Sequence, residues 1–201
     1  MNTIIFDIDG TLVDSMGVDP ELYNSSIERV LGPVRLRDLN DYIHVTDSGI
    51  LGQIIEENGF SGASELAASV KALFIKKLNR HIEDTGSFPV IDGAIQFIDR
   101  VRRSTDTRIA IATGCWRESA LLKLQTSGFD IEGIPVATSD DSPSRVEIMR
   151  SALRMTGSAP GKVTYFGDAE WDQRACDDLG WNFVAVGPRL GGIESYSSVQ
   201  L

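Results

Sequence analysis

Cysteine is scarce in this chain of 201 residues, which holds only two of them. Cys115 and Cys176 cannot build a disulfide framework or a four-ligand zinc site. Long hydrophobic runs are also missing, since no apolar stretch approaches the roughly 20 residues of a membrane span. The first residues carry no basic region and no cleavage-site pattern, so nothing in them suggests export. We therefore expect a soluble, cytoplasmic protein that does not bind membranes.

Positive charge is in short supply. The chain has 19 Lys and Arg residues against 29 Asp and Glu residues, for a formal net charge of −10. This sign opposes binding to a nucleic-acid backbone or an anionic membrane surface, so neither partner is expected. An acidic protein can still bind a phosphorylated small molecule, provided that a metal or nearby cationic side chains neutralise the charge of the binding site. The remaining composition, 42% hydrophobic and 24% charged, is that of a globular protein with a buried core.

Five short apolar runs predict β-strands. Each is nearly continuous in Ile, Val, Ala or aromatic residues, as expected of strands that are covered on both faces. The runs are residues 3–8, 108–112, 134–137, 163–166 and 182–186. Helical patterns separate the later runs, and this alternation predicts a parallel, doubly wound α/β sheet with helices on both faces. The Gly- and Ser-rich tail from Arg189 is expected to be a surface coil.

The interval after the first run has a different pattern. Residues 17–87 hold no convincing strand but three amphipathic helical patterns. One of these begins after Thr46, Asp47 and Ser48, which are all good N-cap residues. We predict a small helical domain over residues 17–87, inserted into a core domain made of residues 1–16 and 88–201.

Acidic side chains follow two of the predicted strands, and a hydroxyl follows a third. Asp7 and Asp9 come at the end of the first strand, Thr113 at the end of the second, and Asp168 and Asp172 after the fourth. Ligands of open α/β sheets bind beyond the carboxyl ends of the strands. We therefore expect carboxylates from remote parts of the chain to converge on one crevice.

Carboxylates that lie close together raise one another's pKa values, or their repulsion destabilises the site, unless a cation binds between them. Mg²⁺ favours oxygen ligands and suits two Asp side chains plus a backbone carbonyl. A carboxylate held beside a metal-bound phosphoryl group can attack phosphorus and form an aspartyl phosphate. The pattern thus favours Mg²⁺ as cofactor and phosphoryl chemistry at the crevice.

The motifs resemble those of the haloacid dehalogenase (HAD) superfamily. The segment from Asp7 to Ser15 reads DIDGTLVDS, and Thr113 and the Gly167-Asp168-x-x-x-Asp172 pattern follow in the family's order. The resemblance runs nearly from end to end, because the insertion after the first strand agrees as well. It implies a Rossmann-like core with a helical cap and a phosphoric monoester hydrolase that uses Mg²⁺.

The resemblance also implies a role for each of these residues. Asp7 would be the nucleophile, and Asp9 the general acid and then the base for the attacking water. Thr113 would hydrogen-bond the phosphoryl oxygens. Asp168, with Asp7 and the Asp9 carbonyl, would hold Mg²⁺, while Asp172 would support the water shell of the metal.

One family element departs from the pattern. HAD phosphatases usually supply a Lys ahead of the helix that leads into the fourth strand, and here that stretch reads DDSPSR over residues 140–145. Arg145 is the best candidate for the cation that offsets charge on Asp7 and the phosphoryl group. Arg is a rigid fork and Lys a point charge, so the fit need not be the same. Lys162 is a second candidate on charge alone, but it lies at the wrong end of its strand.

The leading hypothesis is a magnesium-dependent phosphatase that acts on a small phosphorylated metabolite, since a helical lid excludes bulky polymers. Two alternative functions stay open. One is a phosphomutase with the same first motif, and the other is a non-catalytic phospho-acceptor or binding module. A phosphonate hydrolase would need a Schiff-base Lys from the cap, and Lys71, Lys76 and Lys77 lie in a pattern typical of a solvated face.

Specificity cannot be derived from the sequence. Tyr23, Asn24 and His44 could face the substrate from the cap, but no pattern selects them. The identity of the substrate and the oligomeric state also stay open.

Overall fold

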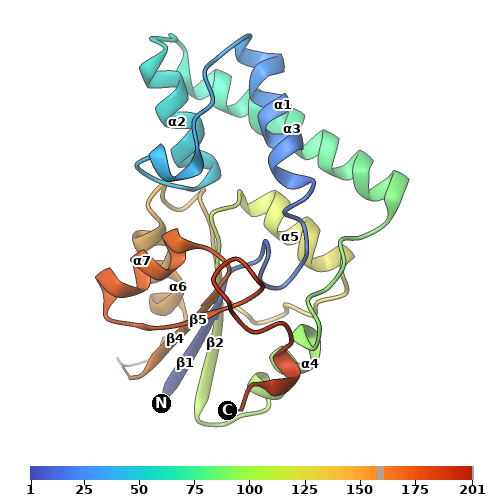
Figure 1. Cartoon of the computed structure of the whole chain (residues 1–201), viewed down its shortest axis with the longest axis vertical. Coiled ribbons are helices and arrows are strands. Elements are labelled where there is room, and N and C mark those ends of the chain that lie inside the picture. The colour runs from blue at the N-terminus through green and yellow to red at the C-terminus, as the bar shows by residue number, and fades with distance from the viewer. Residues whose placement is uncertain (158–160, 201) are drawn as a thin grey trace.

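The computed structural model describes residues 1–157 and 161–200, whose core is one five-stranded sheet (Figure 1). Its strands are β1 (Asn2–Phe6), β2 (Thr107–Ala112), β3 (Val136–Ala137), β4 (Val163–Gly167) and β5 (Asn182–Ala185). All four pairings are parallel, in the order β3-β2-β1-β4-β5. The predicted parallel α/β architecture is confirmed.

Helices cover both faces of this sheet. Side chains of β1 alternate between two hydrophobic clusters: Ile4 and Phe6 lie in one, and Ile5 lies in the other. The first cluster includes α4 (Ala94–Arg102) and α5 (Arg117–Thr126), and the second includes α6 (Arg145–Met155) and α7 (Glu170–Leu179). Burial on both faces explains why the strands read as continuous apolar runs. Across the described ranges, no helix combines the length and apolar character needed to cross a bilayer.

Two predicted strands are too long. The run at 134–137 forms only the two-residue β3, because Pro135 has no N–H for a ladder and Ile134 closes a turn onto the Ile131 carbonyl. The first strand ends at Phe6 and not at residue 8. Asp7 therefore lies just beyond β1, at the edge of the sheet where ligands bind in such folds.

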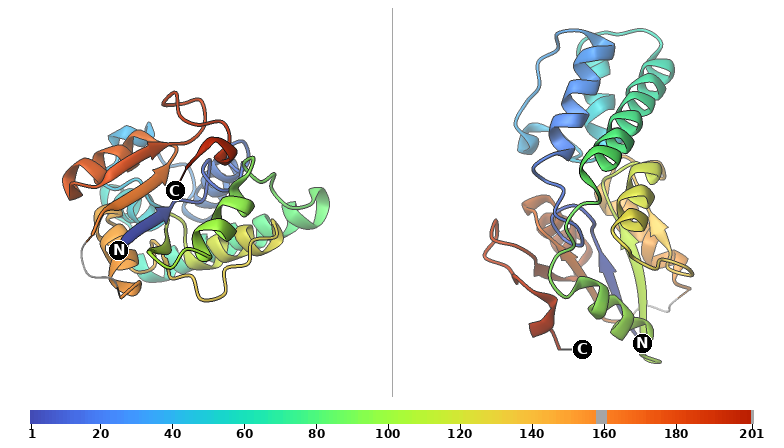
Figure 2. Two further views of the ribbon diagram at one scale, coloured as in Figure 1. Left: turned by 90° about the horizontal axis from the view of Figure 1, so that it is seen from below. Right: turned by 90° about the vertical axis from the view of Figure 1, so that its right-hand side faces the viewer.

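The helical insertion, residues 17–87, forms a layer beyond the carboxyl ends of the strands (Figures 1 and 2). Its helices are α1 (Asp19–Leu31), α2 (Asp47–Glu57) and α3 (Ala63–Thr85). Of the three candidate N-cap residues, Thr46 caps α2, since its Oγ1 accepts a hydrogen bond from the Gly49 N–H at 3.0 Å. The same hydroxyl donates to the Pro143 carbonyl at 2.8 Å, which joins the insertion to the core.

The tail beyond Arg189 is not the expected surface coil. Tyr196 is completely buried and packs its ring 5.3 Å from that of Phe97 and 5.5 Å from that of Phe166. Its hydroxyl donates to the Thr11 carbonyl at 3.1 Å. The expectation was wrong because the Gly and Ser content of the tail obscured one aromatic side chain with a place in the core.

Candidate active site

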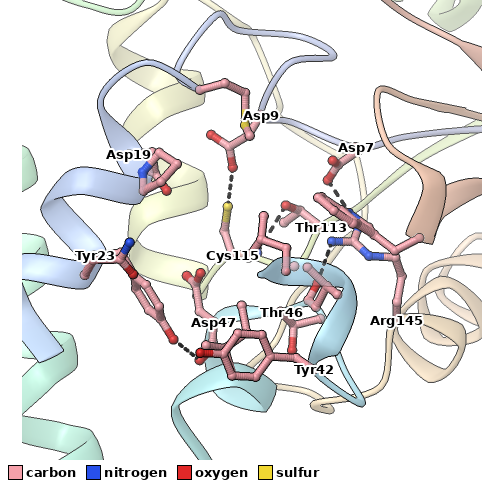
Figure 3. A pocket seen from close by; sticks show the side chains of 18 of the residues that line it. Asp7, Asp9, Asp19, Tyr23, Tyr42, Thr46, Asp47, Thr113, Cys115 and Arg145 are labelled. Atoms are coloured by element: carbon pink, nitrogen blue, oxygen red, sulfur yellow. Dashed lines mark hydrogen bonds and ion pairs between the residues drawn. The ribbon is translucent and has the colours of Figure 1, made fainter. Parts of the chain in front are cut away.

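A cavity of about 280 Å³ lies between the carboxyl ends of the strands and the helical insertion (Figure 3). Five of the six predicted site residues line it: Asp7, Asp9, Thr113, Arg145 and Asp168. The sixth, Asp172, is fully buried and contacts the guanidinium of Arg145. All six therefore gather at one edge of the sheet.

Three carboxylates meet at the floor of this cavity. Asp7, Asp168 and Asp172, here called the acidic trio, each offer an oxygen within 4.8 Å of the others. Burial, together with the charge of Asp172, raises the pKa of Asp7 to about 7. Burial and the charge of Asp7 likewise raise the pKa of Asp168 to about 7. Burial raises the pKa of Asp172 to about 6, although the nearby Arg145 opposes the shift.

The acidic trio fits a divalent cation. Asp7 Oδ1 and Asp172 Oδ2 are buried and have no hydrogen-bond partner. Buried polar atoms without partners are costly, so each calls for an explanation such as a bound ion. Hard carboxylate oxygens in a compact group are the ligands that Mg²⁺ prefers. The side chain of Asp9 lies outside this group, so only its backbone carbonyl stays predicted as a ligand.

Gly10 allows the acidic trio to assemble. Its φ of +70° lies in the left-handed region, which disfavours other residues. A Cβ at this position would lie 2.5 Å from Asp168 Oδ2. The glycine that follows Asp9 is therefore needed for both the turn and the close approach of Asp168.

Arg145 begins α6 and reaches into the trio. Its Nη1 lies 2.8 Å from Asp172 Oδ1 and 3.7 Å from Asp7 Oδ1. Its Nη2 donates to the Val45 carbonyl of the insertion at 3.1 Å. One guanidinium thus spans two carboxylates of the core and the backbone of the insertion. Lys162 is exposed at the start of β4, at the opposite end of the sheet.

The side chain of Asp9 turns away from the trio toward α5. Its Oδ1 lies 2.6 Å from the ammonium of Lys123 and accepts from the Ser15 hydroxyl, while its Oδ2 accepts from the Cys115 thiol at 2.6 Å. Burial acts to raise the pKa of Asp9, but Lys123 and these donors outweigh it and lower the pKa. Lys123 is completely buried and also lies 2.6 Å from Asp19 Oδ1.

Sequence reasoning missed Lys123. The buried residues of α5 are Ser119, Ala120, Lys123 and Leu124, so the lysine lies on the same face of the helix as its apolar neighbours. Lys is almost never fully buried unless it is paired. The spacing of Lys123 from the apolar residues of the predicted helix, which places it on the buried face, is the signal by which it could have been identified.

Thr113 lines the cavity as one of the predicted site residues. It is buried, and its Oγ1 accepts from the Cys115 N–H at 3.3 Å.

The walls of the cavity also hold residues that no sequence pattern selected. Tyr23 and Asn24 line the cavity from α1, and Asp47 lines it from α2. Asp47 Oδ2 accepts from the Trp116 N–H at 2.9 Å, and burial and Asp19 raise the pKa of Asp47 to about 8.

Comparisons with known proteins agree with this geometry. Residues 4–186 match the model of a family described as haloacid dehalogenase-like hydrolase. No curated protein matches the chain in sequence.

Several solved structures share the fold. A hydrolase from Pseudomonas syringae is 21% identical, with a TM-score of 0.73 over 92% of this chain and 84% of that one. CbbY from Rhodobacter sphaeroides in complex with phosphate is 18% identical, with a TM-score of 0.70 over 98% and 89%. A β-phosphoglucomutase from Clostridium difficile is 14% identical, with a TM-score of 0.70 over 92% and 84%. At these identities the likeness is one of fold.

Proposed function

The chain belongs to the haloacid dehalogenase-like hydrolases, and from this membership we propose that it is a magnesium-dependent phosphatase of a small phosphorylated metabolite. The proposal rests on one observation: the buried acidic trio lies beside Arg145, at the end of the cavity opposite the helical insertion. The names of the structural relatives support phosphate chemistry, since CbbY was solved with phosphate and another relative is a β-phosphoglucomutase. We further propose that the helical insertion acts as the cap over this cavity.

Two steps would complete the reaction on residues of this chain. A carboxylate oxygen of Asp7 attacks phosphorus, the bond to the leaving oxygen breaks, and Asp9 gives that oxygen its proton. A water molecule then attacks the phosphoryl group on Asp7 while Asp9 takes up its proton, which releases phosphate and restores Asp7. Arg145 and Thr113 hold the phosphoryl oxygens through both steps.

The acidic trio explains the metal requirement in this proposal. Asp7 and Asp168, with the Asp9 carbonyl, would hold Mg²⁺, and Asp172 would support its water shell. When bound, the ion would neutralise charge on the phosphoryl group and keep Asp7 ionised, against the burial that raises its pKa.

The cap side of the cavity favours a leaving group without a second anion. Among the described residues that line the cavity, only Arg37 and Arg145 are cationic. Arg37 is already paired with Glu57 at 2.5 Å, and Arg145 faces the trio. Asp19 of α1 and Asp47 of α2 also line the cavity. A second phosphate or a carboxylate would find no free cation there, so we propose a neutral, hydroxyl-bearing leaving group.

The proposed function is tested by phosphate release from p-nitrophenyl phosphate. We expect activity with Mg²⁺, loss with EDTA, and recovery when Mg²⁺ is restored. Asp7→Asn should abolish release, whereas Asp14→Asn, an exposed acid of the same motif, should behave as the unchanged protein. Full activity in Asp7→Asn would contradict the covalent mechanism. Phosphoryl transfer to an added sugar phosphate in preference to water would identify a phosphomutase.

A panel of natural phosphomonoesters tests the leaving-group class. Hexose monophosphates and glycerol 3-phosphate should give a kcat/KM at least about tenfold above phosphoglycolate and hexose bisphosphates, because only the latter carry a second anion into a cavity whose described lining offers it no free cation. A preference for the doubly anionic substrates would show that the charge argument is wrong while leaving the phosphatase assignment intact.

A further inference from the structure

Lys123 is a buried cation that the proposed reaction does not use. Its side chain has no exposed surface, and its Nζ lies 2.6 Å from Asp9 Oδ1, 2.6 Å from Asp19 Oδ1 and 3.4 Å from Cys115 Sγ. An ammonium group has three protons to donate, so these contacts satisfy it. Burial of a lysine is costly unless its charge is compensated, and here two carboxylates compensate it.

The partners of Lys123 come from three parts of the fold. Lys123 belongs to α5 of the core, Asp9 to the loop after β1, and Asp19 is the first residue of α1. Figure 3 shows Asp9 and Asp19 on the same wall of the cavity, with the carboxylate of Asp9 aimed at Cys115. The ammonium therefore joins the loop that carries Asp9 to the point where the chain enters the insertion.

The contacts of Asp9 fix the orientation of its carboxylate. Ser15, Cys115 and Lys123 donate to its two oxygens from different directions. All three bonds end on a carboxylate, but the hydroxyl and the thiol are neutral donors, and only the ammonium adds the attraction of a full opposite charge. Of the three, Lys123 contributes most to holding the side chain where it is.

We propose that Lys123 is the positioning residue of Asp9: it holds the acid–base carboxylate at the wall of the cavity and shares its ammonium with Asp19, the first residue of α1. The inference rests on the proposed function only for the role of Asp9. Lys123 itself does not reach the reacting atoms, since its three contacts leave it enclosed behind Asp9. Its effect on the reaction is exerted through the orientation of that carboxylate.

The kinetic test removes the charge with little change of volume. Lys123→Met should lower kcat by about 10- to 100-fold, within the range of general acid–base contributions, while KM changes less than about threefold. In an Asp9→Asn background the same substitution should change kcat less than about twofold, because Lys123 acts through Asp9. Independent, multiplying effects in this cycle, or an unchanged kcat in folded Lys123→Met, would overturn the proposal.

A second variant separates positioning from stability. Lys123→Met leaves Asp9 and Asp19 facing each other without a cation, which destabilises the fold. Lys123→Met/Asp19→Asn removes one of the two charges and should recover much of the melting temperature but not the lost kcat. Recovery of full kcat in this double variant would mean that Lys123 merely neutralises Asp19, and the proposal would be wrong.

Crystal structures of the unchanged protein and of the double variant give a readout that does not depend on activity. The carboxylate of Asp9 should leave its contact with Cys115 when Lys123 is replaced. An unchanged orientation would refute positioning by Lys123 even if the chain had no phosphatase activity. Absence of that activity in the unchanged protein would instead count against the proposed function.

Discussion

Asp7 and Asp9 carry the same chemical group two residues apart, yet their surroundings shift their pKa values in opposite directions. Burial and Asp172 raise the pKa of Asp7 to about 7. Lys123 and hydrogen bonds lower the pKa of Asp9 in spite of its burial. Burial and Asp172 produce the shift at Asp7, where Arg145 opposes it, and Lys123 produces the opposite shift at Asp9. Without metal these shifts favour a neutral Asp7 and an ionised Asp9. The proposed roles therefore require a bound cation that ionises Asp7, and Asp9 must take up a proton before it can give one to the leaving oxygen.

Replacement of Asp9 tests the role proposed for it. Asp9→Asn keeps the shape of the side chain but cannot exchange a proton with the leaving group. We expect kcat to fall by about 10²- to 10⁴-fold, measured as phosphate release at saturating substrate. A loss below a few-fold would remove Asp9 from the acid–base role.

Replacement of Gly10 tests the close approach on which the acidic trio depends. Gly10→Ala places a Cβ against Asp168 Oδ2 and also strains a positive φ. Gly59→Ala is the matched control, because Gly59 has a φ of +66° but nothing within 4 Å of the added Cβ. Gly59→Ala should lose about 1–2 kcal/mol of unfolding free energy from the strained φ alone, and Gly10→Ala should lose more because of the added clash. Only Gly10→Ala should require more Mg²⁺ for half-maximal phosphate release; equal Mg²⁺ dependence would contradict the packing argument.

The sequence predicted those residues whose position follows from strand ends. Asp7 and Asp168 follow neighbouring parallel strands, so their convergence is a consequence of topology. Lys123 was not predicted, because its burial depends on how α5 packs against a loop and a helix that are distant in sequence. The position of Asp47 in the cavity wall was missed for the same reason.

At the scale of elements, α6 connects the site to the insertion through its first residue. Arg145 contacts Asp172 with Nη1 and the Val45 carbonyl with Nη2. A lysine has a single nitrogen and could not hold both partners in this geometry. The arginine in place of the family's usual lysine therefore couples the core helix to the helical layer above it.

Two substitutions at this position separate charge from geometry. Arg145→Lys keeps the positive charge beside Asp7 but loses the bond to Val45, so kcat/KM should fall by about tenfold. Arg145→Met also loses the charge and should fall at least tenfold further, given the cost of leaving Asp172 unpaired. Steady-state kinetics on one substrate would measure both; equal activity of the lysine variant and the unchanged protein would show that the fork geometry is dispensable.

Most elements were predictable because the strands are covered on both faces and the helices of the insertion have clear periodicity. The exceptions share a physical cause. One proline shortens β3, and one buried aromatic residue attaches the tail to the core. In both segments a single side chain determines the structure, whereas the prediction relied on the average composition of the segment.

Substitution of Tyr196 tests whether the tail belongs to the core. Tyr196→Ala should cost about 3–5 kcal/mol of unfolding free energy, as expected for a large buried side chain. Tyr196→Phe loses only the bond to the Thr11 carbonyl and should cost about 1 kcal/mol. Denaturant unfolding would measure both variants, and an unaffected Tyr196→Ala would restore the view of the tail as a surface coil.

At the scale of the whole molecule, buried acids link stability to pH. Folding raises the pKa values of Asp7 and Asp168 to about 7 and of Asp172 to about 6. Between about pH 4 and pH 7 the folded state therefore binds more protons than the unfolded state. The free energy of unfolding must then fall as the pH rises through this window.

Thermal unfolding without metal should show this dependence. We expect a lower melting temperature at pH 8 than at pH 5. The free energy of unfolding should fall by up to about 1.4 kcal/mol per pH unit for each group that titrates. Mg²⁺ should raise the melting temperature more at pH 8, where the trio is ionised, than at pH 5. Asp7→Asn should flatten the profile. A melting temperature that rises from pH 5 to pH 8 in the metal-free protein would contradict these pKa shifts.

The bond between Tyr196 and Thr11 has a consequence for synthesis. The loop after β1 is translated well before the hydroxyl that supports its backbone, which belongs to a residue 185 positions later. A nascent chain therefore carries the motif from Asp7 to Ser15 without that support until translation has passed residue 196. Messages truncated before that codon should yield products with a poorly ordered motif, even though every predicted site residue has already been made.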